Sequence, residues 1–223
     1  MPNRTRANRE TEVKLRVADL PAMICALGRT GAKLRGRVLE RNTLYDTPGA
    51  DLRRARCLLR VREEYPAAAA TPKGAIPAGP RRTVLTWKAP VSGSGASRYK
   101  EKLEQEATVA SGKPWAQILR SLGFRRTFQY EKYRTSYRWG GLHLDLDETP
   151  VGVFLELEGP PGAIDRTAAR LNFAPRDYLR DTYWDLYAAD CKRRGRVPKN
   201  MLFAAKVRRN RQSLLDKVSV SLY

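Results

Sequence analysis

The sequence has few of the residues from which disulfide frameworks and zinc sites are built. It contains one histidine, His143, and three scattered cysteines, Cys25, Cys57 and Cys191. This odd and unpaired set argues against a disulfide framework and against thiolate-bound zinc, and it suits a reducing compartment. A lone histidine cannot form a His-rich site, so we expect His143 to be a spectator rather than a catalytic base.

Long apolar runs and phosphate-binding glycine loops are also lacking. No apolar stretch approaches the roughly 20 residues of a membrane-spanning helix, and the basic N-terminus has no apolar signal core. No GxxxxGK motif is present, which excludes a P-loop nucleotide site. We therefore expect a soluble, cytoplasmic protein that does not bind a membrane.

Positive charge is abundant. Forty-three Lys and Arg residues against 23 Asp and Glu residues give a net charge of +20. Such an excess predicts a polyanionic partner, which could be nucleic acid, a phosphorylated metabolite or a membrane surface. Nearly half of the excess lies after residue 191.

Composition along the 223 residues predicts one domain with appendages. We expect a disordered N-terminus over residues 1–8, a single domain over residues 9–191 and a basic C-terminal tail over residues 192–223. An Ala/Pro/Gly-rich stretch at residues 65–80 has no periodicity and is predicted to be a flexible insertion at a hairpin tip.

Charged and apolar residues alternate along eight predicted strands. In the first strand Glu10, Glu12 and Lys14 share one parity and Val13 and Leu15 the other, so the strand separates a charged face from an apolar face. The predicted strands are residues 10–17, 33–47, 57–63, 83–88, 98–109, 124–139, 142–148 and 153–159. The predicted helices are residues 19–28, 113–122, 163–172 and 176–191.

A charged face on nearly every strand predicts an inverted barrel. If an antiparallel sheet closes on itself, the apolar faces pack outward against the helices and the charged faces line a central tunnel. The expected fold class is therefore α+β, mainly β, with an eight-stranded antiparallel closed β-barrel, a charged lumen and helices packed outside.

The charged faces also predict what the lumen binds, because an ionised side chain out of water costs several kcal/mol unless it is paired or bound. The acids on this face are Glu10, Glu12, Glu104, Glu106, Asp147, Glu156 and Glu158. The bases are Lys14, Arg60, Arg62, Lys88, Lys100, Lys132 and Arg134. Carboxylates without a Cys or His cluster fit Mg²⁺ or Mn²⁺ rather than Zn²⁺, and Lys and Arg donors fit phosphate oxygens. Together they predict a metal-bound polyphosphate ligand.

An ordered set of motifs between Glu10 and about Tyr187 resembles the CYTH superfamily, the triphosphate tunnel metalloenzymes. The matching segments are Glu10–Lys14 (ExExK), Asn42–Pro48 (TYxDTP-like), Leu59–Glu63 (LRxRE), Leu85–Lys88 (LTxK), Lys100–Glu106 (REExExE-like), Glu131–Arg134 (KxR) and Leu146–Glu158 (D…LGxFxExE). The family includes class IV adenylyl cyclases, thiamine triphosphatases and inorganic triphosphatases. Lys100 departs from the pattern where the family often has Arg, and Lys102 departs where an acid is common.

The resemblance implies a role for each matched residue. It makes the ExExK motif of Glu10, Glu12 and Lys14 the catalytic motif. The implied triphosphate ligands are Lys14, Arg60, Arg62, Lys88, Lys132 and Arg134, with Lys100 as a further candidate from the departing strand. The implied ligands of one or two divalent cations are Glu10, Glu12, Asp147, Glu156 and Glu158, with Glu104 and Glu106 in support.

Three functions remain open on the sequence. The first, which we expect, is a Mg²⁺- or Mn²⁺-dependent hydrolase that releases phosphate from inorganic triphosphate, thiamine triphosphate or a nucleoside triphosphate. The second is a class IV adenylyl cyclase that converts ATP to cyclic AMP and diphosphate, and it needs a base-and-ribose pocket that the sequence does not show. The third is a non-catalytic binder of polyphosphate or, through the basic tail, of nucleic acid; seven acids facing the ligand argue against it. The sequence leaves monomer and homodimer equally open.

Overall fold

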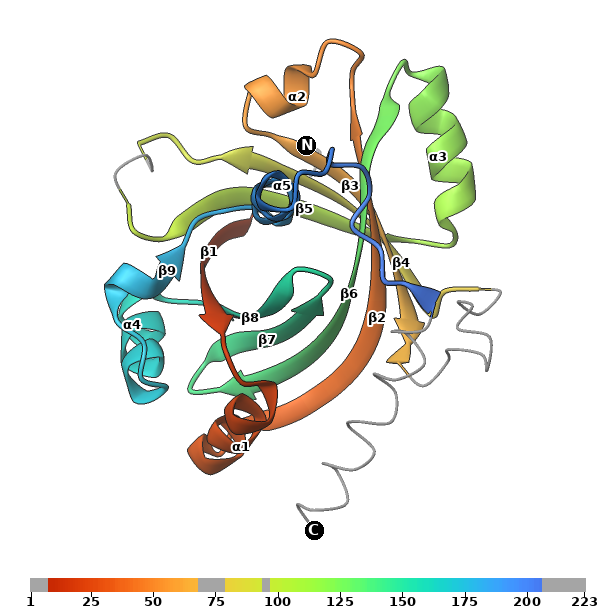
Figure 1. Cartoon of the computed structure of the whole chain (residues 1–223). Helices are drawn as coiled ribbons and strands as arrows, with labels where there is room; N and C mark the ends of the chain where they lie inside the picture. Colours follow the sequence, from red (N-terminus) through yellow and green to blue (C-terminus); the bar gives the residue numbers. More distant parts are fainter. Residues whose placement is uncertain (1–7, 68–78, 94–96, 206–223) are drawn as a thin grey trace, which may run out of the picture.

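The computed structural model describes residues 8–67, 79–93 and 97–205, and Figure 1 shows the chain. The strands are β1 (Asn8–Val17), β2 (Lys33–Asp46), β3 (Leu58–Pro66), β4 (Arg82–Pro90), β5 (Lys100–Val109), β6 (Arg125–Trp139), β7 (Leu142–Thr149), β8 (Gly152–Glu158) and β9 (Tyr178–Leu179). The helices are α1 (Leu20–Thr30), α2 (Asp51–Arg54), α3 (Gly112–Ser121), α4 (Pro161–Arg170) and α5 (Tyr183–Arg193), with a 3₁₀ turn η3 at Pro175–Asp177.

The strands close into an antiparallel barrel. Their order is β5-β4-β3-β2-β6-β7-β8-β1, and β1 pairs back onto β5 with Glu12 opposite Lys100. The short strand β9 adds to β1 beyond this junction, with Leu179 opposite Lys14. The predicted eight-stranded closed barrel is thus confirmed, and β9 is an extra strand.

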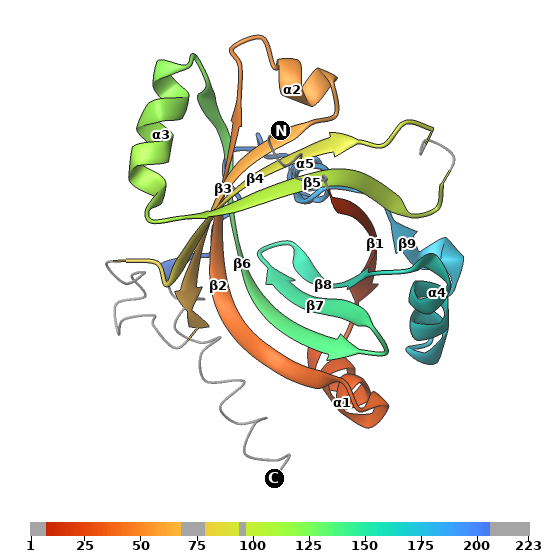
Figure 2. The same cartoon turned by 180° about the vertical axis from the view of Figure 1, so that it is seen from behind.

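The apolar faces of the strands point outward, as the alternation predicts. Val13 and Leu15 of β1 are almost fully buried, and they pack in one core with Leu27 of α1 and Ile164 of α4. Burying a side chain of this size contributes roughly 1.5–3 kcal/mol. Both views show α1, α3 and α4 outside the ring of strands (Figures 1 and 2). The main apolar core therefore lies between barrel and helices, which leaves the lumen to the charged face.

The start of the last helix differs from the prediction of residues 176–191. Residues before Tyr183 form η3 and β9 instead, and α5 begins after a capping box. In that box the hydroxyl of Thr182 accepts a hydrogen bond from the backbone N–H of Asp185, whose carboxylate accepts one from the backbone N–H of Thr182. The aromatic run that suggests one long helix is therefore divided between an edge strand and a capped helix.

The segment after α5 runs along the outside of the barrel. Met201 forms a parallel bridge with Tyr130 of β6, and Phe203 packs with its ring centroid 5.3 Å from that of Tyr133. Part of the predicted basic tail is thus docked on the fold, while residues 206–223 lie outside the described residues. Of the expected insertion, residues 65 and 66 complete β3 and residues 68–78 lie outside the described residues.

Asn8, which the sequence placed in the disordered N-terminus, already pairs with Glu104 of β5. Across the described parts of the chain, helices long and apolar enough to traverse a bilayer are absent.

Candidate active site: a charged tunnel

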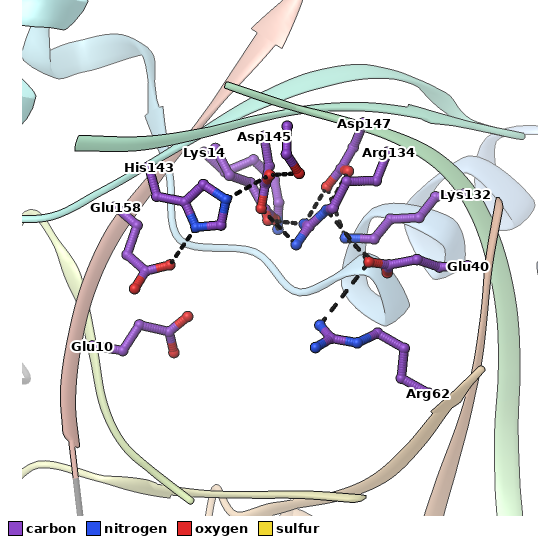
Figure 3. A network of polar contacts seen from close by, with 12 residues as sticks. Glu10, Lys14, Glu40, Arg62, Lys132, Arg134, His143, Asp145, Asp147 and Glu158 are labelled. Atoms are coloured by element: carbon purple, nitrogen blue, oxygen red, sulfur yellow. Dashed lines mark hydrogen bonds and ion pairs between the residues drawn. The ribbon is translucent and has the colours of Figure 1, made fainter. Parts of the chain in front are cut away.

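Among the described residues, every acid and base predicted to face the lumen, apart from Glu158, takes part in an ion pair with a Lys, Arg, Asp or Glu residue there. Figure 3 shows Glu10 and Lys14 of β1, Arg62 of β3, and Lys132 and Arg134 of β6 extending into the same space. Alternation along each strand places them there, because residues two apart point to the same side of a sheet. The structure thus brings the predicted residues together in one network.

Lysines pair with carboxylates of other strands toward one end of the tunnel. The ammonium group of Lys88 lies 2.5 Å from Oε2 of Glu10 and 3.0 Å from Oε1 of Glu104. Lys100 reaches Oε1 of Glu12 at 2.6 Å. These pairs join β1 to β4 and β5. Lys88 and Lys100 therefore occupy the carboxylates that the sequence assigns to metal binding.

Arg134 is the centre of the network. Its guanidinium lies 2.7 Å from Asp145, 2.7 Å from Asp147 and 2.5 Å from Glu156. Burial alone would lower the pKa of Arg134, but these three carboxylates and Glu40 hold it well above its usual value. The guanidinium is fixed in position and fully charged.

Two arginines of β3 are less well satisfied. Arg60 is buried, and its Nε has no hydrogen-bond partner within the described part of the chain. Its terminal nitrogens lie 3.5 Å from the hydroxyl of Tyr130, 3.3 Å from that of Thr86 and 3.5 Å from a carboxylate oxygen of Glu106. Arg62 shares Glu106 with Arg60, at 3.3 Å and 3.5 Å. Buried donors without good acceptors are costly, and phosphate oxygens would satisfy them.

Lys14 lies at the floor of the tunnel. Its side chain is 3% exposed, and its ammonium lies 3.3 Å from Glu156 and donates to the backbone oxygen of Asp181 at 3.1 Å. It also lies 4.1 Å from the centroid of the Tyr183 ring. Burial lowers the pKa of Lys14, although Glu156 opposes the change.

Helix α5 closes this end of the barrel. Both views show α5 end-on beside β5 at the edge of the ring of strands (Figures 1 and 2). Tyr183 from its first turn is buried between Tyr130 and Phe154. The hydroxyl of Tyr183 donates to Oδ2 of Asp147 at 2.7 Å. The tunnel therefore has an aromatic floor and opens at the end where Glu10 and Glu158 lie.

Sequence reasoning missed three lumen residues. Glu40 of β2 is 1% exposed and lies 3.6 Å from Lys132 and 3.7 Å from Arg134. The sequence could have indicated Glu40, because it lies two residues before Asn42 in the same predicted strand and therefore on the same face of the sheet. Asp145 shares the parity of Asp147 and could have been found in the same way. Tyr183 enters from a helix, and no local pattern indicates that.

The carboxylates at the open end have the chemistry of a divalent-cation site. Burial and the negative charges of Glu10 and Glu12 raise the pKa of Glu158 to about 7, and burial with Glu12 raises that of Glu10. These raised values mark Glu10 and Glu158 as carboxylates short of positive charge, which a hard cation would supply. At Glu12 burial is outweighed by Lys100, and its pKa is lowered to about 2. As they stand, however, the described residues include no group of three or more Asp, Glu, His or Cys side chains arranged around one ion position. The donor types fit Mg²⁺ or Mn²⁺, and binding requires Glu10 and Glu12 to exchange their lysines for the ion.

His143 lies at the same open end. Its Nε2 is 3.4 Å from Asp145 and its Nδ1 is 3.9 Å from Glu158. These contacts place the ring between two carboxylates of the lumen, as Figure 3 shows.

A family model for the CYTH domain matches residues 8–171, which covers the barrel from β1 to the end of α4. The chain belongs to the CYTH domain family. No curated protein matches this CYTH chain. Solved structures do resemble it.

A candidate adenylate cyclase from Vibrio parahaemolyticus superposes on the CYTH barrel with a TM-score of 0.66 at 18% identity, over 81% of this chain and 98% of its own. A protein from Pyrococcus horikoshii gives 0.62 at 21%, over 81% and 99%. A candidate adenylyl cyclase from Hippeastrum with a dominant triphosphatase activity gives 0.53 at 19%, over 85% and 97%. At these identities the likeness shows the fold alone.

Proposed function

We propose that this CYTH protein is a divalent-metal-dependent hydrolase that releases phosphate from a triphosphate. One observation carries the proposal: cations from β1, β3, β4 and β6 converge in a tunnel closed at one end, and the buried Nε of Arg60 has no hydrogen-bond partner among the described residues. A chain of phosphates has the charge and the acceptor oxygens that these cations would bind.

The Lys and Arg residues would bind different phosphates along the tunnel. Lys14 and Lys132 lie beside the closed floor, within 4.1 Å and 5.0 Å of the Tyr183 ring centroid, and would bind the phosphate at the inner end. Arg60, Arg62 and Arg134 would bind along the walls, with Lys88 and Lys100 nearer the open end. A floor that stops the chain at a fixed depth also fixes which phosphorus lies beside the attacking water, and positioning can contribute about 7–11 kcal/mol.

The carboxylates at the open end would hold the metal ion. Glu10, Glu12 and Glu158 offer the hard oxygen ligands, with Asp147 and Glu156 deeper in the lumen and Glu104 and Glu106 in support. A bound Mg²⁺ or Mn²⁺ would neutralise phosphate charge and favour ionisation of the attacking water. Two ions could be accommodated only if the deeper carboxylates release Arg134 and Lys132.

Phosphate and metal binding would help each other. In the structure Lys88 pairs with Glu10 and Lys100 with Glu12. Phosphates would attract these lysines, which frees the carboxylates for the cation. Phosphate would thus draw the lysines away from the metal-binding carboxylates, and the cation would draw the carboxylates away from the phosphate-binding lysines.

The closed floor favours hydrolysis over cyclisation of ATP. A cyclase must hold a base and a ribose at one end of its tunnel, so that the 3′-hydroxyl reaches the α-phosphate, which is attached to the ribose. Here Tyr183 and Phe154 fill one end, and carboxylates line the other, where a base and ribose would have to bind. A non-catalytic polyphosphate binder is disfavoured, because a pure polyanion site gains nothing from so many acids.

The test is phosphate release from inorganic triphosphate, thiamine triphosphate and ATP with Mg²⁺ or Mn²⁺. We expect release from at least one, and a loss of 100-fold or more, about 2.7 kcal/mol in the barrier, in Glu10→Gln and in Lys14→Ala with the fold retained. Lys113→Ala on the exterior helix α3 should keep full activity. No release from any of the three would refute the hydrolase, and cyclic AMP from ATP would establish the cyclase.

A further inference from the structure

A second concentration of positive charge lies outside the tunnel, where the starts and ends of several elements meet. Its members are Arg29, Lys33, Arg35, Arg138 and Arg170, and we call them the basic patch. All five cations are exposed. They come from α1, β2, β6 and α4.

Two neighbouring cavities hollow this surface. One of about 290 Å³ is lined by Lys33, Arg35, Arg138 and Trp139 together with Gly31, Gly140, Gly141 and Leu142. The other, of about 250 Å³, is lined by Arg29 and Arg170 together with Ala26, Thr30, Leu171 and Asn172. Arg170 links them, because its guanidinium lies 5.3 Å from the centroid of the Trp139 ring. The described linings of both cavities include cations and no carboxylate.

The charges of the patch are not compensated within the fold. Lys33 of β2 pairs directly with Arg138 of β6, and like charges opposite each other destabilise a sheet. None of the ion pairs found among the described residues involves a member of the patch, whereas the tunnel arginines Arg62 and Arg134 each pair with carboxylates. The fold thus tolerates a local repulsion that a bound polyanion would relieve.

Ordinary structural roles account for only part of the patch. Arg29 and Arg170 lie in the last turns of α1 and α4, where positive charge favours the helix dipole. Lys33, Arg35 and Arg138 have no such role. The register between β2 and β6 shifts between Leu34 and Gly36, so Arg35 is the extra residue of a bulge. Bulges redirect side chains, and this one adds Arg35 to the lining of the first cavity.

The rest of the surface suits a chain with bases as well as phosphates. Gly140 and Gly141 form the turn between β6 and β7, and nothing lies within 4 Å of where their side chains would begin. Bare backbone of this kind permits close approach of a ligand. Trp139 and the guanidinium groups offer flat faces on which bases stack.

The patch is distinct from the tunnel floor but adjoins its open end. Arg138 has the parity of Lys132 and Arg134 on β6, and it pairs with His143 of β7. His143 in turn lies 3.9 Å from Glu158. The patch therefore continues the cationic row of β6 past the point where the tunnel opens.

We propose that the basic patch is a docking surface for single-stranded nucleic acid. Two cavities joined by Arg170 extend over more than one phosphate, which fits a backbone of repeating charges better than a single anion. The interaction is electrostatic with base stacking and carries no sequence preference. It is independent of the hydrolysis proposed for the lumen.

The test uses the full chain and a fluorescent RNA of about 20 nucleotides with a 5′-hydroxyl, longer than the ~4–16 nucleotides that one small domain typically covers. In Lys33→Gln/Arg35→Gln/Arg138→Gln we expect affinity to fall at least tenfold. The slope of log affinity against log salt should fall by about 2, because each single-strand phosphate contact contributes about 0.7. Arg29→Gln/Arg170→Gln should give a smaller fall in the same direction.

The matched control is Arg125→Gln/Arg126→Gln/Arg176→Gln, which removes the same charge from exposed sites. Two of these arginines begin β6, at the end of the strand opposite Arg138. The control should change affinity less than twofold, and all variants should keep the wild-type melting temperature within a few degrees and the wild-type rate of triphosphate hydrolysis. Equal losses in patch and control variants would refute the patch, as would complete displacement of RNA by tripolyphosphate, which would place the RNA in the tunnel. If the patch variant Lys33→Gln/Arg35→Gln/Arg138→Gln lost binding to anionic lipid vesicles but bound RNA like the wild type, the basic patch would be a membrane-binding surface instead.

Discussion

The hydroxyl of Tyr183 donates a 2.7 Å hydrogen bond to Oδ2 of Asp147, and this contact ties α5 to the wall of the lumen. The same carboxylate accepts from Lys132 at 2.8 Å and from Arg134 at 2.7 Å. The helix that closes the tunnel is thus anchored to the group that orients two of its cations. Closure and electrostatic organisation depend on one another.

Removing that hydroxyl should therefore destabilise the fold. In Tyr183→Phe we expect the free energy of unfolding to fall by about 1.5–3 kcal/mol, because a hydrogen bond to a buried charged group is lost while the ring remains. Urea denaturation measures the change. Tyr187→Phe is the matched control four residues along α5: its hydroxyl donates to the backbone oxygen of Asn200 at 3.0 Å in an exposed setting, and we expect a loss below about 1 kcal/mol. Equal losses of unfolding free energy in the two variants would show that the hydrogen bond to Asp147 stabilises the fold no more than an exposed one.

Metal and triphosphate should stabilise the protein synergistically. Because Lys88 and Lys100 compete with a cation for Glu10 and Glu12, Mg²⁺ alone should raise the melting temperature little. With tripolyphosphate present the same Mg²⁺ should raise it by several degrees more than the sum of the separate effects. Thermal shift assays at one ionic strength test this, and in Glu10→Gln the synergy should shrink. Purely additive shifts in the wild type would contradict the exchange of partners.

Glu40 should make stability depend on acid pH. Burial would raise its pKa, but Lys132, Arg134 and Arg62 hold it well below its usual value of 4.5. A carboxylate with a lowered pKa stabilises the fold above its unfolded value, and this contribution is lost as the pH falls through the folded value. The stability difference between wild type and Glu40→Gln should thus be largest near pH 7, about 3–5 kcal/mol, and should shrink below about pH 4.5.

Chemical denaturation of both proteins at several pH values measures that difference. Glu101→Gln, which removes the carboxylate of an exterior pair 2.6 Å from Arg9, should change stability by less than about 1 kcal/mol at every pH. A difference for Glu40→Gln that stays constant down to pH 3 would mean that its charge does not stabilise the fold.

The segment that follows α5 should contribute measurably to stability. Phe203 is 4% exposed against Tyr133, so Phe203→Ala should cost about 3–5 kcal/mol or release the segment from β6. Leu202→Ala next to it, at 36% exposure, should cost below about 1 kcal/mol. Calorimetric melting compares the two. Indistinguishable melting temperatures would contradict docking of this segment.

Much of the barrel could be predicted because side-chain direction alternates strictly along a strand. Glu10, Glu12 and Lys14 face the lumen as their spacing requires, and no tertiary information is needed for that. The same rule is weaker in β2, where Arg37 and Arg41 lie on the face opposite Glu40 and the bulge after Leu34 shifts the phase. Where both faces of a strand carry charged residues, alternation alone does not show which face lines the lumen.

Contacts between distant elements could not be predicted. Lys88 reaches Glu10 although β4 and β1 are not neighbours in the sheet, so the pair depends on how the barrel closes. Tyr183 enters the lumen only because β9 and the capping box at Thr182 set where α5 begins. Such relationships are set by closure and helix docking, which one-dimensional patterns do not encode.

The most direct test of the lumen as a triphosphate site is calorimetric titration with tripolyphosphate in EDTA, where turnover is prevented. We predict one tripolyphosphate per chain and at least tenfold weaker binding in Lys14→Ala, whose cation at the tunnel floor is lost. Lys113→Ala on the exterior of α3 should bind as the wild type does, and circular dichroism should show all three proteins folded. Unchanged affinity in folded Lys14→Ala would contradict binding of the triphosphate at the floor of the tunnel.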